Sequence, residues 1–391
     1  MNAAVLLEAC REAGIDFYTG VPDSFLKGLC DELYDRYGTA GKAHTVAHNE
    51  GGAVALCAGH YLATGRPALC YMQNSGLGNA VNPLASLMDE KVYRIPCLLV
   101  IGWRGEPGTK DEPQHVTQGA ITRGQLELLD IPFQVLGPED TEESFAEKFI
   151  LLRETLAEGK VAALLARKGA LTSSRHPAYG NARSMTREAA AGLVLSAAGA
   201  EDVFVCTTGK LSREVFELRE RRGEGHGRDF LTVGSMGHAS MIALQIAREK
   251  PDRRVWCLDG DGAVLMHLGA MALIGEKQPR NLIHAVINNG AHETVGGMPV
   301  CSGGLNLRGL ALAAGYAAAE TASDPRELAE KLEKIRRSEG PLLLEIRCAN
   351  GARADLGRPT TTPAQNRDAL MNWLNSPEGR RPERNSRPVQ G

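Results

Sequence analysis

The chain has 391 residues, of which 43% are hydrophobic and 23% charged, with a formal net charge of −3. This length exceeds one ordinary hydrophobic core and predicts two globular domains. The near-neutral charge gives no basis for nucleic acid as a partner, and no apolar run approaches the roughly 20 residues of a membrane helix. Nine cysteines lie mostly in apolar segments without a C-x-x-C pair, which indicates reduced thiols in a cytoplasmic protein.

The first half of the chain alternates short apolar runs with helical patterns. The apolar runs are too short for helices and lack strict alternation, which is typical of strands buried on both faces of a parallel sheet. We expect strands at 67–72, 96–101 and 161–166, and helices at 51–63 and 143–158.

The second half repeats this rhythm, and the whole pattern predicts an α/β fold with two doubly wound parallel-sheet domains. The polar stretch 172–184 reads as a linker, so we expect domains at 1–175 and 176–375, followed by a disordered tail at 376–391. The expected strands are 203–206, 255–258, 282–287 and 342–346, and the expected helices are 186–198, 239–250 and 325–337.

The clearest motif follows the strand at 255–258. The sequence runs VWCLDGDG over 255–262, then a helical pattern, then a second apolar strand that ends in Asn288 and Asn289. Glycines at a helix start let backbone N–H groups approach a diphosphate, while Asp261 and Asn289 offer the oxygen ligands that Mg²⁺ prefers. Two ordinary strand-to-helix turns are the alternative, but the combination is far more specific than an isolated Gly-Asp-Gly.

This combination resembles the fingerprint of the thiamine-diphosphate enzymes, the decarboxylase–carboligase superfamily. The resemblance implies thiamine diphosphate and Mg²⁺ as cofactors. It also implies a pyrimidine-binding domain followed by a diphosphate-binding domain, without a middle domain. The implied metal ligands are Asp261, Asn289 and the carbonyl of Ala291, and the implied cofactor contacts are Asn79, Ser235, Met236, Gly260, Asp261, Gly262, Ala263 and Asn289. Met236 would be an apolar wedge beneath the cofactor, with simple core filling as the alternative.

Thiamine chemistry requires a carboxylic acid beside the pyrimidine ring of the cofactor. Glu50 stands in the run AHNEGGA and begins an apolar helical pattern, which we expect to be buried on most sides. An acid favoured by the helix dipole is the alternative; beside the diphosphate motif we interpret Glu50 as catalytic. In the superfamily this acid and the anchor come from different subunits, which implies a homodimer or homotetramer with its active site at the subunit interface.

Further runs narrow the resemblance. These runs are GVPDS at 20–24, YMQNSGLGN at 71–79, TTGKLSRE at 207–214 and NGAHET at 289–294. They resemble the phosphonopyruvate decarboxylase family, with the sulfopyruvate decarboxylases as near relatives. The resemblance covers about residues 5–372. It implies decarboxylation of 3-phosphonopyruvate to phosphonoacetaldehyde and CO₂, in phosphonate biosynthesis.

The chemistry of that reaction points to two groups of side chains. The carbon that loses CO₂ must be protonated, and Asp23 and His115, both in predicted loops, are the acid–base candidates. Their alternatives are a turn aspartate and a surface-loop histidine. A phosphonate dianion needs charge-assisted donors. The candidates are Ser24, Arg104, Lys210 and Arg213, although each cation alone is as easily explained as a solvated surface charge.

Other functions remain as alternatives. A sulfopyruvate decarboxylase or a carboligase of the same superfamily fits the same motifs, and Asn288 stands where the phosphonopyruvate decarboxylase pattern favours an acidic residue. A dinucleotide-binding oxidoreductase would need G-x-G-x-x-G, but the cluster at Gly76 and Gly78 lacks the third glycine. A non-catalytic subunit of a split enzyme is disfavoured because Glu50 and the diphosphate motif share one chain.

These interpretations predict different consequences for two substitutions. Glu50→Gln should keep cofactor binding but lower turnover by about a hundredfold or more, because the amide group is not acidic enough to transfer a proton to the pyrimidine ring. Asp261→Ala should lose the cofactor, because a metal ligand is removed. Fluorescence titration with thiamine diphosphate and Mg²⁺, together with CO₂ release, measures both effects. Full activity of Glu50→Gln would overturn the catalytic assignment.

Overall fold

The computed structural model describes residues 1–39, 41–302 and 304–376. The tail predicted at 376–391 therefore lies outside the described residues, apart from Ser376. The chain divides into two compact units, Met1–Asn181 with Gly290–Leu305, and Ala182–Asn289 with Asn306–Gly391. The first boundary between the units thus falls between residues 181 and 182, whereas the sequence predicts it between residues 175 and 176.

One segment of the second half belongs to the first unit. Gly290–Leu305 forms a small antiparallel pair, β11 (Ala291–His292) and β12 (Met298–Pro299). Met298 is fully buried in a core cluster of the first unit. The burial of Met298 explains why this segment belongs to the first unit, although it follows a strand of the second unit.

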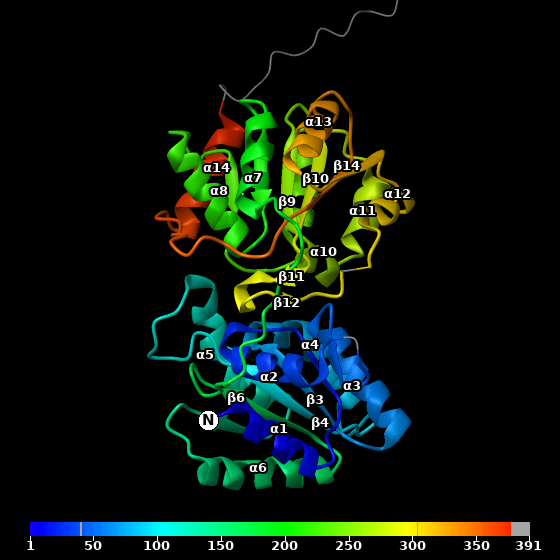
Figure 1. The fold of residues 1–391 in the computed structure, drawn as a ribbon, viewed down its shortest axis with the longest axis vertical. Helices are drawn as coiled ribbons and strands as arrows, with labels where there is room; N and C mark the ends of the chain where they lie inside the picture. Colours follow the sequence, from blue (N-terminus) through cyan, green and yellow to red (C-terminus); the bar gives the residue numbers. More distant parts are fainter. Residues whose placement is uncertain (40, 303, 377–391) are drawn as a thin grey trace, which may run out of the picture. The chain divides into compact units, whose positions relative to one another are not determined.

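The first unit is a six-stranded parallel sheet in the order β2-β1-β3-β4-β6-β5, with helices on both faces (Figure 1). Its three central strands are buried along nearly their whole length, as their apolar sequences predict. The sequence did not predict β1, β2 and β5, which have only three or four residues and no long apolar run. The strands are β1 (Tyr18–Gly20), β2 (His44–Val46), β3 (Ala68–Gln73), β4 (Cys97–Gly102), β5 (Phe133–Leu136) and β6 (Val161–Ala166).

The helices of the first unit cover two separate core clusters, one on each face of its sheet. Alternate residues of β3 supply the two cores, with Tyr71 in one and Met72 in the other. The helices are α1 (Ala3–Glu12), α2 (Lys27–Tyr37), α3 (Glu50–Thr64), α4 (Leu77–Pro83), α5 (Pro113–Leu128) and α6 (Glu142–Ala157).

One helix differs from its prediction. From the sequence we expect the apolar helix that begins near Glu50 to be buried on most sides. This helix is α3. Its inner face is buried, but Leu56 is 41% exposed and Leu62 is 74% exposed. Ala55 and Gly59 are exposed on the same helix. The expectation was wrong for this face, since apolar composition by itself does not show what covers a helix.

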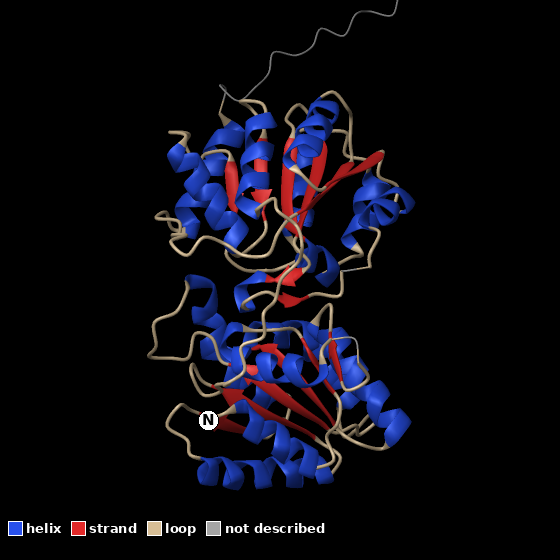
Figure 2. Cartoon of the chain, in the orientation of Figure 1, coloured by secondary structure: helices blue, strands red, loops and turns tan. Residues whose placement is uncertain are grey.

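The second unit is also a six-stranded parallel sheet, in the order β13-β14-β10-β9-β7-β8, and Figure 2 shows its strands between two layers of helices. The strands are β7 (Val203–Cys206), β8 (Asp229–Leu231), β9 (Val255–Gly260), β10 (Leu282–Asn288), β13 (Ala318–Ala322) and β14 (Leu342–Arg347). The helices are α7 (Arg187–Ala197), α8 (Lys210–Arg221), α9 (Ala239–Glu249), α10 (Asp261–Met266), α11 (Ala270–Lys277), α12 (Leu307–Ala313), α13 (Pro325–Arg336) and α14 (Pro363–Asn375).

The two sheets share one topology. If the strands of each sheet are numbered one to six along the chain, both sheets read 2-1-3-4-6-5. In each, the connections leave the first strand in opposite directions, and doubly wound folds bind ligands at such a switch point, beside the carboxyl ends of the first and third strands. The switch point lies between β1 and β3 in one unit and between β7 and β9 in the other.

The predicted α/β class with two doubly wound parallel sheets is confirmed. Among the residues that the structure describes, none of the helices has both the length and the apolar content required to cross a bilayer.

Candidate active site

Glu50 is the first residue of α3 in the first unit, and its side chain is only 5% exposed. The helix begins here because the Asn49 side chain accepts a hydrogen bond from the N–H of Gly52 at 2.7 Å. The Glu50 carboxyl accepts a hydrogen bond from Nδ2 of Asn79, in α4, at 2.7 Å. The two predicted residues Glu50 and Asn79 are therefore brought into direct contact.

The Glu50 carboxyl also requires a glycine beside it. A Cβ added to Gly76 would stand 2.6 Å from Oε1 of Glu50 and 2.5 Å from its Cγ. These distances are far inside van der Waals contact, so Gly76 provides the space that the carboxyl occupies. Gly76 belongs to the quoted run at 71–79, and this contact gives it a physical role.

Asp23 lies at the switch point of the first sheet, three residues after β1. It is 1% exposed and caps a single 3₁₀ turn by accepting from the N–H of Phe25 at 2.9 Å. Gln73, the last residue of β3, donates Nε2–H to Asp23 at 2.6 Å and so joins the two strand ends. Burial raises the pKa of Asp23, and the hydrogen bonds from Gln73 and Phe25 only partly oppose this rise.

His115 was predicted in a loop, and this prediction was wrong. It lies in the first turn of α5, after Pro113 at the helix start, and is 8% exposed. This burial also excludes the surface-loop alternative. Its Nδ1 is buried and makes no hydrogen bond within the described part of the chain. Burial, and then the positive charge of Arg104, lower the pKa of His115, so the neutral ring is favoured.

Arg104 lies two residues after β4 and forms a bidentate pair with Asp111, at 2.8 Å from Nε and 2.5 Å from Nη2. Its Nη1 donates to the hydroxyl of Ser24 at 3.1 Å, and its guanidinium lies 4.7 Å from the ring centre of Phe25. Burial alone would raise the pKa of Asp111, but the hydrogen bonds from Arg104 hold this pKa below its usual range. The pair places a fixed cation beside Ser24 and Asp23.

In the second unit, Asp261 and Asn289 follow two neighbouring parallel strands. Asp261 comes directly after β9 and begins α10, and Asn289 comes directly after β10. Both are almost fully buried, at 3% and 6% exposure. The helical pattern predicted after this point is interrupted after Met266 and divided into α10 and α11.

The residues around these two strand ends form the start of α10 and the turn that follows Asn289. Gly260 precedes Asp261 in an extended conformation, and Gly262 and Ala263 form the first turn of α10. Gly290 has a φ of 72°, a left-handed conformation that turns the chain after Asn289. Ala291 then opens β11, in the segment that is counted with the first unit.

Ser235 and Met236 lie on a loop beside α10. A Cβ on Gly237 would come within 3.0 Å of the Ala263 carbonyl oxygen, so the loop lies against the helix. Ser235 has a φ of 52°, a left-handed conformation that is strained for a residue with a side chain and is often found at ligand sites. Met236 is half-buried and is not among the buried core side chains of the described residues.

Lys210 and Arg213 both lie in the first turn of α8. Lys210 follows Gly209, whose φ of 98° reverses the chain after β7. Arg213 donates from Nε to the carbonyl oxygen of Gly357 at 2.5 Å and from Nη2 to that of Leu356. The guanidinium of Arg213 therefore fixes the segment that carries the run DLGRPT at 355–360.

These side chains fit thiamine diphosphate and Mg²⁺. The second unit offers a carboxylate and an amide oxygen at adjacent strand ends, the hard oxygen donors that Mg²⁺ takes. The first unit offers a buried carboxyl that is held in place by one amide and one glycine. A carboxyl in such a setting can exchange a proton with a ring nitrogen.

Two family models match the chain in the same order as its two sheets. Residues 2–127 match the thiamine pyrophosphate enzyme N-terminal TPP-binding domain, and residues 207–346 match the C-terminal TPP-binding domain. The two matches define the class as the thiamine pyrophosphate enzymes, whose cofactor is thiamine diphosphate.

Similarity to individual proteins extends over nearly the whole chain. The chain is 35% identical over 382 residues to a phosphonopyruvate decarboxylase of Streptomyces viridochromogenes, covering 93% of each chain. It is 34% identical to that of Streptomyces hygroscopicus, covering 93% of this chain and 91% of the relative. A sulfopyruvate decarboxylase of Methanosarcina acetivorans is 26% identical over 322 residues, 76% of this chain and 78% of the relative. The chain belongs to the phosphonopyruvate decarboxylase family.

Sequence reasoning missed the residues that hold the site residues in place. Gln73 fixes Asp23, and Asp111 fixes Arg104. Gln73 stands in the run at 71–79 that carries the family resemblance. A rule that every buried charge needs a partner would have directed attention to them.

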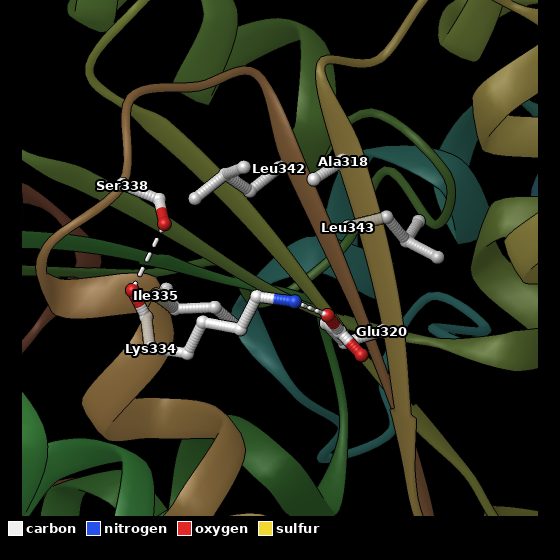
Figure 3. A pocket seen from close by; sticks show the side chains of 7 residues that line it. All are labelled: Ala318, Glu320, Lys334, Ile335, Ser338, Leu342 and Leu343. Atoms are coloured by element: carbon white, nitrogen blue, oxygen red, sulfur yellow. Dashed lines mark hydrogen bonds and ion pairs between the residues drawn. The ribbon is translucent and has the colours of Figure 1, made fainter.

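The small cavity in Figure 3 lies apart from the predicted site residues. It is lined by side chains of β13, α13 and β14, among them Glu320 and Lys334, which form an ion pair. None of the residues predicted for the site lines it.

The contact between Gly76 and Glu50 generates a prediction. Gly76→Ala should displace the Glu50 carboxyl and lower kcat by about tenfold to a hundredfold, since a 1 Å misplacement can cost that much. Gly124→Ala is the matched control, because a Cβ there meets nothing within 4 Å. Steady-state kinetics and melting temperatures of both variants provide the measurement. Wild-type turnover in Gly76→Ala would contradict the role given to Glu50.

Proposed function

We propose that this chain decarboxylates 3-phosphonopyruvate to phosphonoacetaldehyde and CO₂, as a step of phosphonate biosynthesis. The observation that carries the proposal is the 35% identity to a phosphonopyruvate decarboxylase over 93% of both chains. The arrangement of Asp23, Arg104 and His115 around the end of β4 gives it a physical basis.

When bound, thiamine diphosphate supplies the electron sink for the electron pair that remains after CO₂ leaves. Asp261, Asn289 and the carbonyl of Ala291 would hold Mg²⁺. The backbone at Gly260, Gly262 and Ala263 would face the diphosphate, and Ser235 and Met236 would lie beside the cofactor. In the first unit, Glu50 would hold a proton at its carboxyl for the pyrimidine ring, with Asn79 keeping the carboxyl oriented.

Asp23 and His115 are proposed as the acid–base pair. Burial raises the pKa of Asp23 and lowers the pKa of His115, so each shift is in the direction that favours the neutral form of its group. A protonated Asp23 can donate a proton to the substrate carbon, and a neutral His115 can accept one. The Asp23 carboxyl packs against Gly102 and the backbone of His115 packs against Gly105, since a Cβ at either glycine would collide with these atoms.

The anionic group of the substrate is assigned to the donors beside this pair. Arg104 carries a permanent charge, is fixed by Asp111 and lies beside the Ser24 hydroxyl. Lys210, in the first turn of α8, is proposed as a second cation for the anion. Because Arg213 donates to the carbonyls of residues 356 and 357, we assign it the positioning of that segment.

We further propose that the active enzyme is a homo-oligomer in which Glu50 of one subunit serves a cofactor anchored by another. The exposed apolar face of α3, with Leu56 and Leu62, supports this proposal, and Val81 of α4 is 37% exposed. Apolar surface on the helix that begins with the catalytic acid is expected to be covered by a second copy.

Light scattering tests this proposal. The wild-type mass should be at least twice the 41.9 kDa of one chain, and Leu62→Glu should reduce both the mass and kcat. Leu128→Glu, at an 89% exposed position of α5, is the matched control and should change neither. A fully active wild-type monomer would exclude a shared site.

The substrate assignment is tested by CO₂ release from phosphonopyruvate, sulfopyruvate and pyruvate under identical conditions. We expect kcat/KM to be highest for phosphonopyruvate, by about tenfold or more over pyruvate, because charge-assisted bonds to the anion contribute about 1.5–3 kcal/mol each. Faster turnover of sulfopyruvate would favour the function of the Methanosarcina relative. A carboligase would release CO₂ but require an added aldehyde to reach full rate.

A further inference from the structure

A buried glutamate beside the proposed metal ligands is not used by the mechanism above. Glu345 lies in β14 and is 1% exposed. Its carboxylate accepts hydrogen bonds from Nδ2 of Asn288 at 2.8 Å and from the hydroxyl of Thr321 at 3.2 Å. Arg347 adds two longer contacts, 3.3 Å from Nε and 3.4 Å from Nη2.

The strand register explains why these side chains meet. β10 and β14 are parallel neighbours in which Val286 pairs with Glu345 and Asn288 pairs with Arg347. Residues two apart on a strand point to the same face, so Glu345, Arg347 and Asn288 lie together at the carboxyl end of the sheet. Asn288 is the last residue of β10, directly before Asn289.

The charge of Glu345 determines which residue fits at position 288. A buried carboxylate needs donors, and the amide of Asn288 supplies the shortest of them. An aspartate in its place would set two carboxylates against each other at hydrogen-bond distance, where like charges repel. The asparagine at this position, which departs from the acidic residue favoured by the family pattern, is therefore matched to Glu345.

The backbone of Asn288 is fixed as well. Its carbonyl oxygen accepts from the N–H of Cys348 at 2.9 Å and from Nη1 of Arg183. With both the side chain and the carbonyl of Asn288 held, the peptide that leads into Asn289 has little freedom. Partners of this kind behind a metal ligand commonly tune the affinity for the metal.

We infer that Glu345 is a positioning residue for the magnesium site and acts through Asn288 on the orientation of Asn289. This inference rests on the proposed role of Asn289 as a metal ligand. Glu345 need not touch the metal, because its hydrogen bond fixes the residue next to the ligand.

Calorimetric titration of Mg²⁺ into the full-length protein, in the presence of thiamine diphosphate, tests the inference without relying on activity. Glu345→Gln should weaken Mg²⁺ binding about tenfold, because the charge that orients Asn288 is lost. Asn288→Asp should weaken it by about tenfold or more, because two carboxylates then face each other. The double variant Asn288→Asp/Glu345→Gln restores one donor and one acceptor and should return the affinity to within about threefold of wild type.

The matched control is Glu320→Gln. Glu320 stands on β13, the other neighbour of β14, and pairs with Lys331 and Lys334 instead of Asn288 (Figure 3). Its loss should leave Mg²⁺ affinity unchanged, whereas an equal loss in both glutamate variants would overturn the inference. Wild-type affinity of Glu345→Gln, or a double variant no tighter than Asn288→Asp, would also overturn it.

Asn289→Ala separates this inference from the proposed site. If Asn289→Ala binds Mg²⁺ like wild type, the proposed metal ligand itself is wrong and the inference fails with it. If Asn289→Ala loses the metal while Glu345→Gln keeps it, only the positioning role is wrong. Glu345→Gln preserves the size of the side chain, so its result decides the question even where Asn288→Asp does not fold.

Discussion

Parallel strands in one sheet bring all their carboxyl ends to a single edge, and the candidate site depends on this constraint. Asp23, Arg104, Asp261 and Asn289 each follow the end of such a strand within three residues. They lie far apart in the sequence, yet within each unit the parallel strands of one sheet place them at one edge. The apolar strands behind them are buried on both faces, so the fold fixes these positions with side chains that take no part in the chemistry.

A second constraint is that charges at this buried edge need partners. Glu50 has Asn79, Asp23 has Gln73, Arg104 has Asp111 and Glu345 has Asn288. Three of the four partners of these charges are amides, which donate a hydrogen bond without adding a charge of their own. The carboxyls of Glu50 and Asp23 are thereby held in position by uncharged hydrogen-bond partners. Arg104, with a charged partner, is instead fixed as a permanent cation.

The two units use the same strand order for different tasks. The first places Glu50, Asp23 and His115, the proposed proton-transfer groups, whereas the second places the proposed metal ligands Asp261 and Asn289 and the start of α10. No repeat is visible in the residues themselves, because the two edges carry different chemistry and the buried strands need only be apolar. Gly290–Leu305 follows β10 in the chain but belongs to the first unit, where Met298 is buried in the core. This segment joins the strand that precedes Asn289 to the unit that carries Glu50.

The sequence by itself determined the fold class, the strand that ends in Asp261 and the one that ends in Asn289, and the helix that begins at Glu50. These features are local, since apolar runs, glycines and polar strand ends are read from consecutive residues. Only the tertiary structure decided that His115 is buried on a helix, that one face of α3 is exposed and that Glu345 faces Asn288. Each of these depends on which residues meet across strands and helices distant in the sequence, and that pairing leaves no mark on the local pattern.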